Sequence, residues 1–125
     1  MSAQWRVIHD AETGAVVLER ARWCSSYWCH LRGLQFVRSL PENEGLLFVT
    51  DSMSRVGTAI HMMFMFFSIA VVWLDDKGVV VDKKLAKPWR LSYAPQAPAQ
   101  YYIEANTSLL ERVSVGQRLQ FDEVI

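Results

Sequence analysis

A run of 16 residues, AIHMMFMFFSIAVVWL from Ala59 to Leu74, is the most apolar stretch of this chain. As a helix it would reach only about 24 Å, at ~1.5 Å per residue, which is short of the ~30 Å hydrocarbon core of a membrane. His61 lies inside the run, and the acidic pair Asp75-Asp76 closes it. These features disfavour a transmembrane span and predict that the run is buried within the protein.

Phenylalanine, isoleucine, valine and tryptophan dominate the run and favour strands over a helix. At ~3.3 Å per residue, however, the run is too long for one ordinary strand. We therefore predict two core strands that are separated by a break near Phe66-Phe67-Ser68. Both faces of these strands are apolar, as in a central strand that is covered on both sides.

The run also holds most of the methionines, and thioethers beside an imidazole are ligands that suit Cu(I). Methionine is equally an ordinary filler of core gaps. On a strand, Met63 and Met65 would share a face with His61, whereas Met62 would face the other way, and Met53 lies outside the run. We therefore interpret the methionines as core residues and expect neither a metal nor a cofactor.

The rest of the chain alternates short β-rich segments with turn residues such as Gly14, Gly78 and Gly116. Two short helices are predicted, one from Arg22 to Arg32 and one over 106–113, capped by Asn106 or Thr107. The predicted strands cover 5–9, 15–20, 45–50, 71–75, 79–83, 101–105 and 118–123, with loops at 51–56 and 84–99. This pattern predicts an α+β, mostly β fold, in which a mixed, largely antiparallel sheet closes into a compact, barrel-like single domain over residues 1–125.

The chain carries 13 basic and 13 acidic residues, so its formal net charge is zero. A neutral total provides no overall field for nucleic acid or anionic lipid, and we expect neither nucleic acid nor a membrane as a partner. Neutrality combined with five tryptophans favours self-association into a homo-oligomer. The first residues, MSAQWRVIHD, lack the pattern of a secretory signal, so a cytoplasmic location is expected.

Cys24 and Cys29 would stay reduced in such a compartment. On the predicted helix, positions five apart point ~140° away from each other and do not share a face. Their spacing is not that of a Cys-x-x-Cys redox pair, and no second Cys/His pair completes a zinc site. We interpret both cysteines, and the adjacent His30, as structural or incidental.

Several short blocks follow one another in the order and spacing of the domain-of-unknown-function 192 family. Together they cover about residues 21–121, and they are Arg32-Gly33-Leu34, Arg38-Ser39-Leu40-Pro41, Gly45-Leu46-Leu47-Phe48, Ile60-His61-Met62, Phe64-Met65, Val72-Trp73-Leu74-Asp75, Pro88-Trp89-Arg90, Tyr102-Ile103-Glu104 and Val115-Gly116. The chain resembles this family, and the resemblance implies a small, β-rich, barrel-like domain with no established activity.

The chain departs from the family pattern at three positions. Phe66 and Ala70 stand where the family usually has an arginine and an aspartate, and Gln117 replaces the aspartate of the closing Gly-Asp. If the family's shared polar residues form one site, the resemblance implies that this chain has lost part of it.

The charged and aromatic residues of the family-like blocks are the candidate ligand-binding residues: His61, Arg90, Glu104, Arg32 and Trp89. His61 is either a satisfied core histidine or an imidazole that binds or transfers a proton. Arg90 either pairs with Glu104 or presents a planar fork to a carboxylate or phosphate. No residue is assigned to catalysis.

These residues predict a non-enzymatic module that binds a small molecule or another protein. The alternative is a small enzyme in which His61 is the acid/base and Arg90 orients an anionic substrate.

Overall fold

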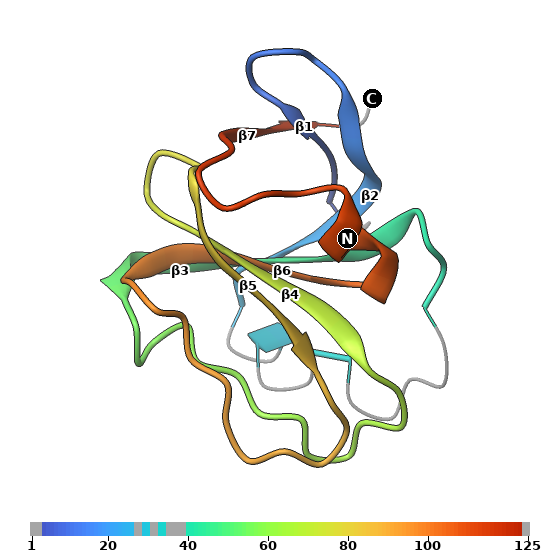
Figure 1. Ribbon diagram of the computed structural model, residues 1–125, viewed down its shortest axis with the longest axis vertical. Helices are drawn as coiled ribbons and strands as arrows, with labels where there is room; N and C mark the ends of the chain where they lie inside the picture. Colours follow the sequence, from blue (N-terminus) through green and yellow to red (C-terminus); the bar gives the residue numbers. More distant parts are fainter. Residues whose placement is uncertain (1–3, 27–28, 31–32, 35–39, 124–125) are drawn as a thin grey trace.

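The computed structural model describes residues 4–26, 29–30, 33–34 and 40–123 (Figure 1). It contains one seven-stranded sheet with the strand order β5-β4-β6-β3-β2-β1-β7. The strands are β1 (Trp5–Asp10), β2 (Val16–Cys24), β3 (Glu44–Ser54), β4 (Ile69–Leu74), β5 (Val80–Ala86), β6 (Ala99–Ala105) and β7 (Leu119–Glu123), and a 3₁₀ helix, η1, spans Thr107–Glu111. The expected mostly-β fold is confirmed.

The sheet curls into a half-barrel. β2 and β3 run parallel, and all other neighbouring strands are antiparallel. The two edge strands approach each other at the start of β5, where the Val80 amide donates to the Gln117 carbonyl and the Leu119 amide donates to the Gly78 carbonyl, both at 2.9 Å. The predicted hairpins β1–β2 and β4–β5 are both present, because their Gly14 and Gly78 turns adopt the positive φ that glycine tolerates.

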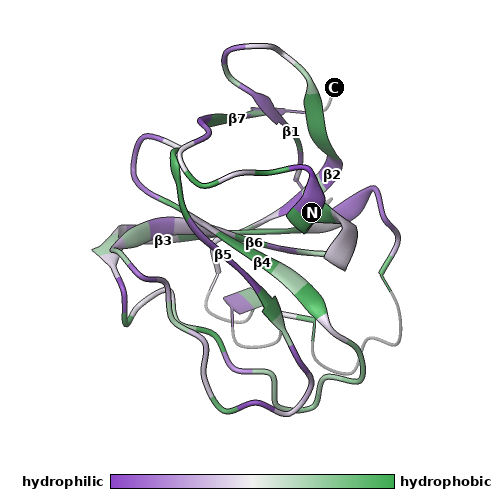
Figure 2. Ribbon diagram, viewed as in Figure 1, coloured by the Kyte–Doolittle hydropathy of each residue, from purple (hydrophilic) through white to green (hydrophobic). Residues whose placement is uncertain are grey.

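The curled sheet has a hydrophobic core on each face, and β4 contributes to both. All six of its residues are buried, and most of β4 is coloured as hydrophobic in Figure 2. Val72 and Leu74 face the core inside the curl with Ile103 and Leu47, whereas Trp73 and its alternate neighbours face the outer core. This arrangement confirms the expectation of a central strand covered on both sides.

The 3₁₀ helix η1 closes the inner core through Leu109. Asn106 caps the helix by accepting a hydrogen bond from the Ser108 amide. At its other end, the Lys83 ammonium group of β5 donates to the carbonyls of Leu110 and Val113, each at 2.7 Å. One side chain of the sheet therefore satisfies two carbonyls that the short helix leaves unpaired.

Only the second half of the apolar run forms a strand, so the prediction of two strands in this run is wrong. Residues 59–68 instead cross the outer face of the sheet as an irregular segment, and Ile60 forms an isolated β-bridge with Tyr93. Phe64 has a φ of 63°, which turns the chain where a strand would have continued. The segment is apolar because Ile60, Met62 and Met65 cover the outer core, and not because it pairs within the sheet.

The prediction of two short helices is also wrong. Arg22 to Cys24 belong to β2, because their backbone pairs with β3 from Arg22–Leu46 to Cys24–Phe48. The remainder of the predicted helix lies partly outside the described residues. Within the described part of the chain, the second predicted helix is the 3₁₀ turn η1, and the loop expected from residue 51 begins only after β3 ends at Ser54.

Among the described residues, no helix has both the length and the apolarity needed to cross a membrane.

Candidate functional site

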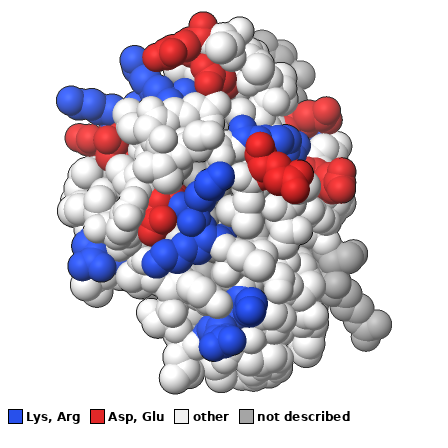
Figure 3. All heavy atoms as spheres, viewed as in Figure 1, with Lys and Arg blue, Asp and Glu red and all other residues white. Residues whose placement is uncertain are grey.

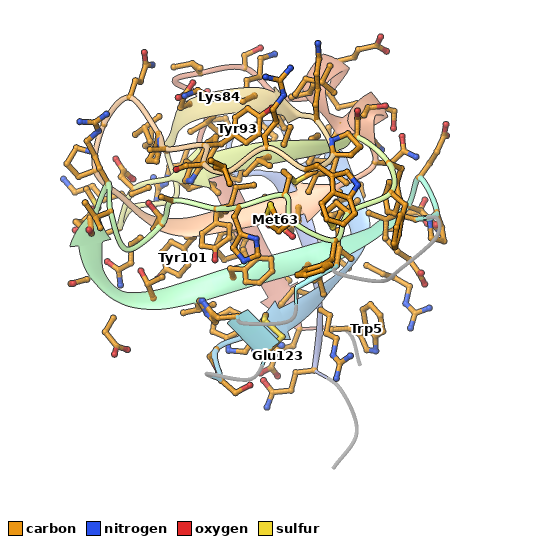
Figure 4. All side chains as sticks on the ribbon, turned by 90° about the horizontal axis from the view of Figure 1, so that it is seen from below. Trp5, Met63, Lys84, Tyr93, Tyr101 and Glu123 are labelled. Atoms are coloured by element: carbon orange, nitrogen blue, oxygen red, sulfur yellow. A yellow bond between two sulfur atoms is a disulfide. The ribbon has the colours of Figure 1, made fainter. Side chains whose placement is uncertain are left out.

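A small pocket lies on the outer face of the sheet, between strand β6 and the irregular segment 59–68. Its volume is about 70 Å³. The lining combines apolar side chains with imidazoles, a phenol and a carboxyl, and it consists of His30, Gly33, Leu34, Ala59, Ile60, His61, Met62, Met65, Tyr102 and Glu104. Figure 4 views the molecule from the side on which this segment lies, with Met63 near the centre.

Glu104 is the carboxyl group of the pocket. It lies near the end of β6, opposite Leu46 of β3 and Val71 of β4, and it is 7% exposed. Burial raises the pKa of this carboxyl to about 8. No ion pair joins Glu104 to another residue in the described parts of the chain.

Tyr102 lies two residues before Glu104 and faces the same side of β6. Its ring stacks on Phe48 with centroids 4.5 Å apart, and burial, with the charge of Glu104 as a smaller cause, raises the pKa of its phenol. The His30 ring meets both aromatic rings edge-on, at 5.3 Å from Phe48 and 6.1 Å from Tyr102. These rings form one wall of the site and hold the phenol in its protonated form.

His30 belongs to this site, although its sequence neighbourhood suggested an incidental residue. Its Nε2 donates to the Val49 carbonyl oxygen of β3 at 2.9 Å. A lone histidine within a predicted helix gives no signal of proximity to Glu104 in the sequence. The neighbouring Cys29 is the one sequence feature that could have indicated a covalent link between this segment and the sheet.

Cys24 and Cys29 form a disulfide, so the expectation of reduced, unassociated cysteines is wrong. The expectation rested on a cytoplasmic location and on a helix that keeps the two side chains apart, whereas Cys24 ends β2 and the chain turns immediately afterwards. The turn brings the two Cα atoms to 5.6 Å, within the range that a disulfide spans. The bond anchors Cys29, whose carbonyl accepts from the Gly33 amide, and a Cβ at Gly33 would lie 3.5 Å from Glu104 Oε1.

His61 lies at the rim of the pocket and is exposed. Its Nδ1 accepts a hydrogen bond from the Met63 amide at 3.3 Å, which leaves Nε2 as the nitrogen that carries the proton in the neutral ring. The structure therefore brings two of the candidate residues, His61 and Glu104, to one pocket.

Arg90 is exposed and is not among the residues that line the pocket. Its backbone carbonyl accepts from the Met62 amide at 2.9 Å, and no ion pair with Glu104 is formed. Trp89 is also exposed and contacts Phe64 and Phe66 instead of the pocket. Arg32, the remaining candidate, lies outside the described residues.

The three positions that depart from the family pattern lie in three different places. Phe66 is exposed beside Trp89, and Ala70 is buried in the inner core, on the opposite face of the sheet from Glu104. Gln117 lies in the turn before β7, where its amide donates to Asp10 at 2.6 Å and accepts from the Ser114 amide. These replacements therefore do not remove parts of a single site.

Met62 and Met65 are buried in the outer core and line the pocket through their apolar side chains. Among the described residues, no group of three or more histidine, cysteine, aspartate or glutamate side chains is placed to hold a metal ion.

Known proteins resemble this chain over most of its length. Residues 8–121 match the sequence profile of DUF192, described as "Uncharacterized ACR, COG1430". The UPF0127 protein TK1120 of Thermococcus kodakarensis is 38% identical over 98 residues, which cover 78% of this chain and 60% of that protein. A UPF0127 protein of Thermococcus sibiricus is 32% identical over 87% of this chain and 70% of its own length. The chain thus spans about three fifths of the length of TK1120.

Two crystal structures share the fold. A Sinorhizobium meliloti protein provisionally named a transcription regulator superimposes with a TM-score of 0.79 and 17% identity, over 96% of this chain and 94% of its own. A Novosphingobium aromaticivorans protein of unknown function gives a TM-score of 0.73 and 15% identity, over 94% and 84%. The profile match over residues 8–121 and the UPF0127 relatives show that the chain belongs to the DUF192 family.

Proposed function

We propose that this protein is a non-enzymatic module that binds a small organic cation, such as a primary ammonium or guanidinium group, in the pocket at Glu104. One observation carries the proposal: the Glu104 carboxyl is 7% exposed, lines a pocket and has no ion pair with another described residue. A buried carboxylate is expensive without a positive partner, and a bound cation would supply one.

The size of the pocket limits the ligand. A volume of about 70 Å³ holds about five water molecules if each needs roughly 15 Å³. Pockets for drug-sized ligands are several times larger, at roughly 300–1,000 Å³. The ligand, or the part of it that enters, is therefore a group of a few non-hydrogen atoms.

The neighbouring groups fit a cation better than an anion. His30 uses Nε2 to bond Val49, so its neutral ring has an accepting Nδ1, and Tyr102 adds an aromatic ring to the lining. Among the described residues, those that line the pocket include neither lysine nor arginine, which would be needed to neutralise an anion beside Glu104.

Titration with methylammonium and guanidinium chloride, followed by NMR chemical shifts of the pocket residues, tests the proposal. Because Glu104 has a pKa of about 8, its ionised form becomes more abundant as the pH rises towards that value, and binding should strengthen tenfold or less per pH unit. Glu104→Gln should abolish binding, whereas Glu111→Gln on the exposed side of η1 should not change it. Preferential binding of acetate, weakening as the pH rises, would overturn the proposal.

The enzymatic alternative has less support from the geometry. It requires His61 and Arg90 to face one substrate, yet Arg90 is not part of the pocket lining.

A cytoplasmic location stays a prediction, and the Cys24–Cys29 disulfide counts against it because such bonds persist in oxidising compartments.

A further inference from the structure

A second surface lies next to the pocket, at the tips of the two loops that cross the outer face. Four large apolar side chains are exposed there, and we call them the loop-tip patch: Phe64 (44% exposed), Phe66 (57%), Trp89 (48%) and Leu91 (78%). Single exposed apolar residues are common on proteins, but a cluster of four indicates a surface that binds another protein or a membrane.

The backbone holds these side chains outward. The two loops are joined by hydrogen bonds, with the Trp89 amide donating to the Met62 carbonyl at 2.7 Å and the Ile60 and Tyr93 backbones bonding each other. Phe64 and Trp89 both have positive φ values, 63° and 64°, and their rings meet edge-on at 5.4 Å. A bulky residue in this conformation costs roughly 1–3 kcal/mol, so two strained aromatic residues at exposed tips are not explained by folding alone.

The two loops lack acidic residues, although the charges of the whole chain sum to zero. Residues 52–74 and 83–103, which contain both loops, include no aspartate or glutamate. Lys87 and Arg90 flank the patch, are exposed and form no ion pair with another described residue. Figure 3 shows blue without red at the lower end of the molecule, where these loops lie in Figure 1, and most of the red near the other end.

We propose that the loop-tip patch docks this protein onto the surface of an anionic lipid bilayer. Tryptophan and phenylalanine enter the boundary between headgroups and acyl chains, and flanking lysine and arginine bind anionic headgroups. The expectation of no membrane partner rested on the net charge of the whole chain. The two loops, however, carry basic residues and no acidic ones, so the net charge does not describe the surface around the patch. The proposal concerns attachment to a surface and is independent of the cation site.

Co-sedimentation with vesicles tests the proposal. The full chain should sediment with vesicles of equal parts phosphatidylglycerol and phosphatidylcholine, more weakly at high salt, and far less with pure phosphatidylcholine. The double variant Phe66→Ser/Leu91→Ser should bind at least about tenfold more weakly, because it removes two apolar anchors from exposed positions that folding does not need. Lys87→Gln/Arg90→Gln should reduce the preference for the anionic vesicles.

The matched control is Val16→Ser/Val115→Ser, which removes apolar side chains of similar exposure (55% and 52%) away from the patch. This control should bind as the wild type does, and circular dichroism should show all variants folded. The proposal is overturned if the wild type ignores anionic vesicles, or if the control loses binding equally. It is also overturned if the wild type instead forms a concentration-dependent dimer that Phe66→Ser/Leu91→Ser abolishes, because the patch would then bind a second copy.

Discussion

His30 and Val49 are joined by a hydrogen bond of 2.9 Å between Nε2 and the carbonyl oxygen. Since a carbonyl oxygen only accepts, Nε2 carries the proton and Nδ1 is the accepting nitrogen of the neutral ring. The bond places His30 against β3, and the disulfide at Cys29 holds the preceding residue to the end of β2. One wall of the pocket is thus attached to the sheet at two points, and Glu104 faces it from a third strand.

The raised pKa of Glu104 makes stability depend on pH. The folded state keeps a proton that the unfolded chain releases between pH 4.5, its ordinary pKa, and about 8. The free energy of unfolding should therefore fall as the pH rises through this window, by up to ~1.4 kcal/mol per unit, and stay low above it. Urea unfolding of the wild type and Glu104→Gln below, within and above the window measures the effect. A constant difference between the two proteins would contradict it.

Removal of the disulfide should destabilise the fold. A bond that closes a six-residue loop restricts the unfolded chain, so Cys24→Ser/Cys29→Ser should lower the free energy of unfolding by ~2 kcal/mol. Reduction of the wild type with dithiothreitol should have the same effect, and the double variant should not respond to it. Urea unfolding with and without reductant measures both. Equal stability of all four samples would show that the bond adds nothing.

Alanine substitutions at Gly78 and Gly14 should distinguish the cost of a positive φ from the cost of a steric clash. Both have positive φ values, but a Cβ at Gly78 would lie 2.5 Å from the Leu119 carbonyl oxygen, whereas a Cβ at Gly14 meets nothing within 4 Å. Gly14→Ala should cost about 1 kcal/mol through conformation alone, and Gly78→Ala at least about twice as much because β7 must shift. Thermal unfolding measures both. Equal losses would mean that β7 moves away without penalty.

Lys83 should stabilise the closure of the inner core. Its ammonium group donates to the Leu110 and Val113 carbonyls at the end of η1, so Lys83→Met should cost ~2 kcal/mol. Lys87→Met, at an exposed lysine without such bonds to described residues, is the control and should change stability by less than ~0.5 kcal/mol. Hydrogen exchange of the η1 amides should quicken only in the first variant. Unchanged exchange in Lys83→Met would contradict this role.

The sequence was sufficient for features that depend on neighbouring residues. The Gly14 and Gly78 hairpins, the Asn106 cap and the burial of Val71 to Leu74 follow from turn chemistry, capping preference and hydrophobicity. These are local properties, because the residues that decide them lie within a few positions of one another. Most of the apolar run was correctly identified as core for the same reason, since burial needs only an apolar side chain and not a particular partner, but Phe64 and Phe66 are exposed.

Pairing between distant segments decided the rest. Arg22 to Cys24 form a strand because β3 lies beside them, whereas residues 59–68 do not, because their backbone turns at Phe64 and follows the 89–93 loop. Local pattern cannot distinguish these cases, since strand formation depends on an available neighbouring strand. The pocket likewise joins His30, His61 and Glu104, and the lower end of the molecule in Figure 3 shows basic but no acidic side chains. Such groupings arise only when the curled sheet brings residues distant in sequence into contact.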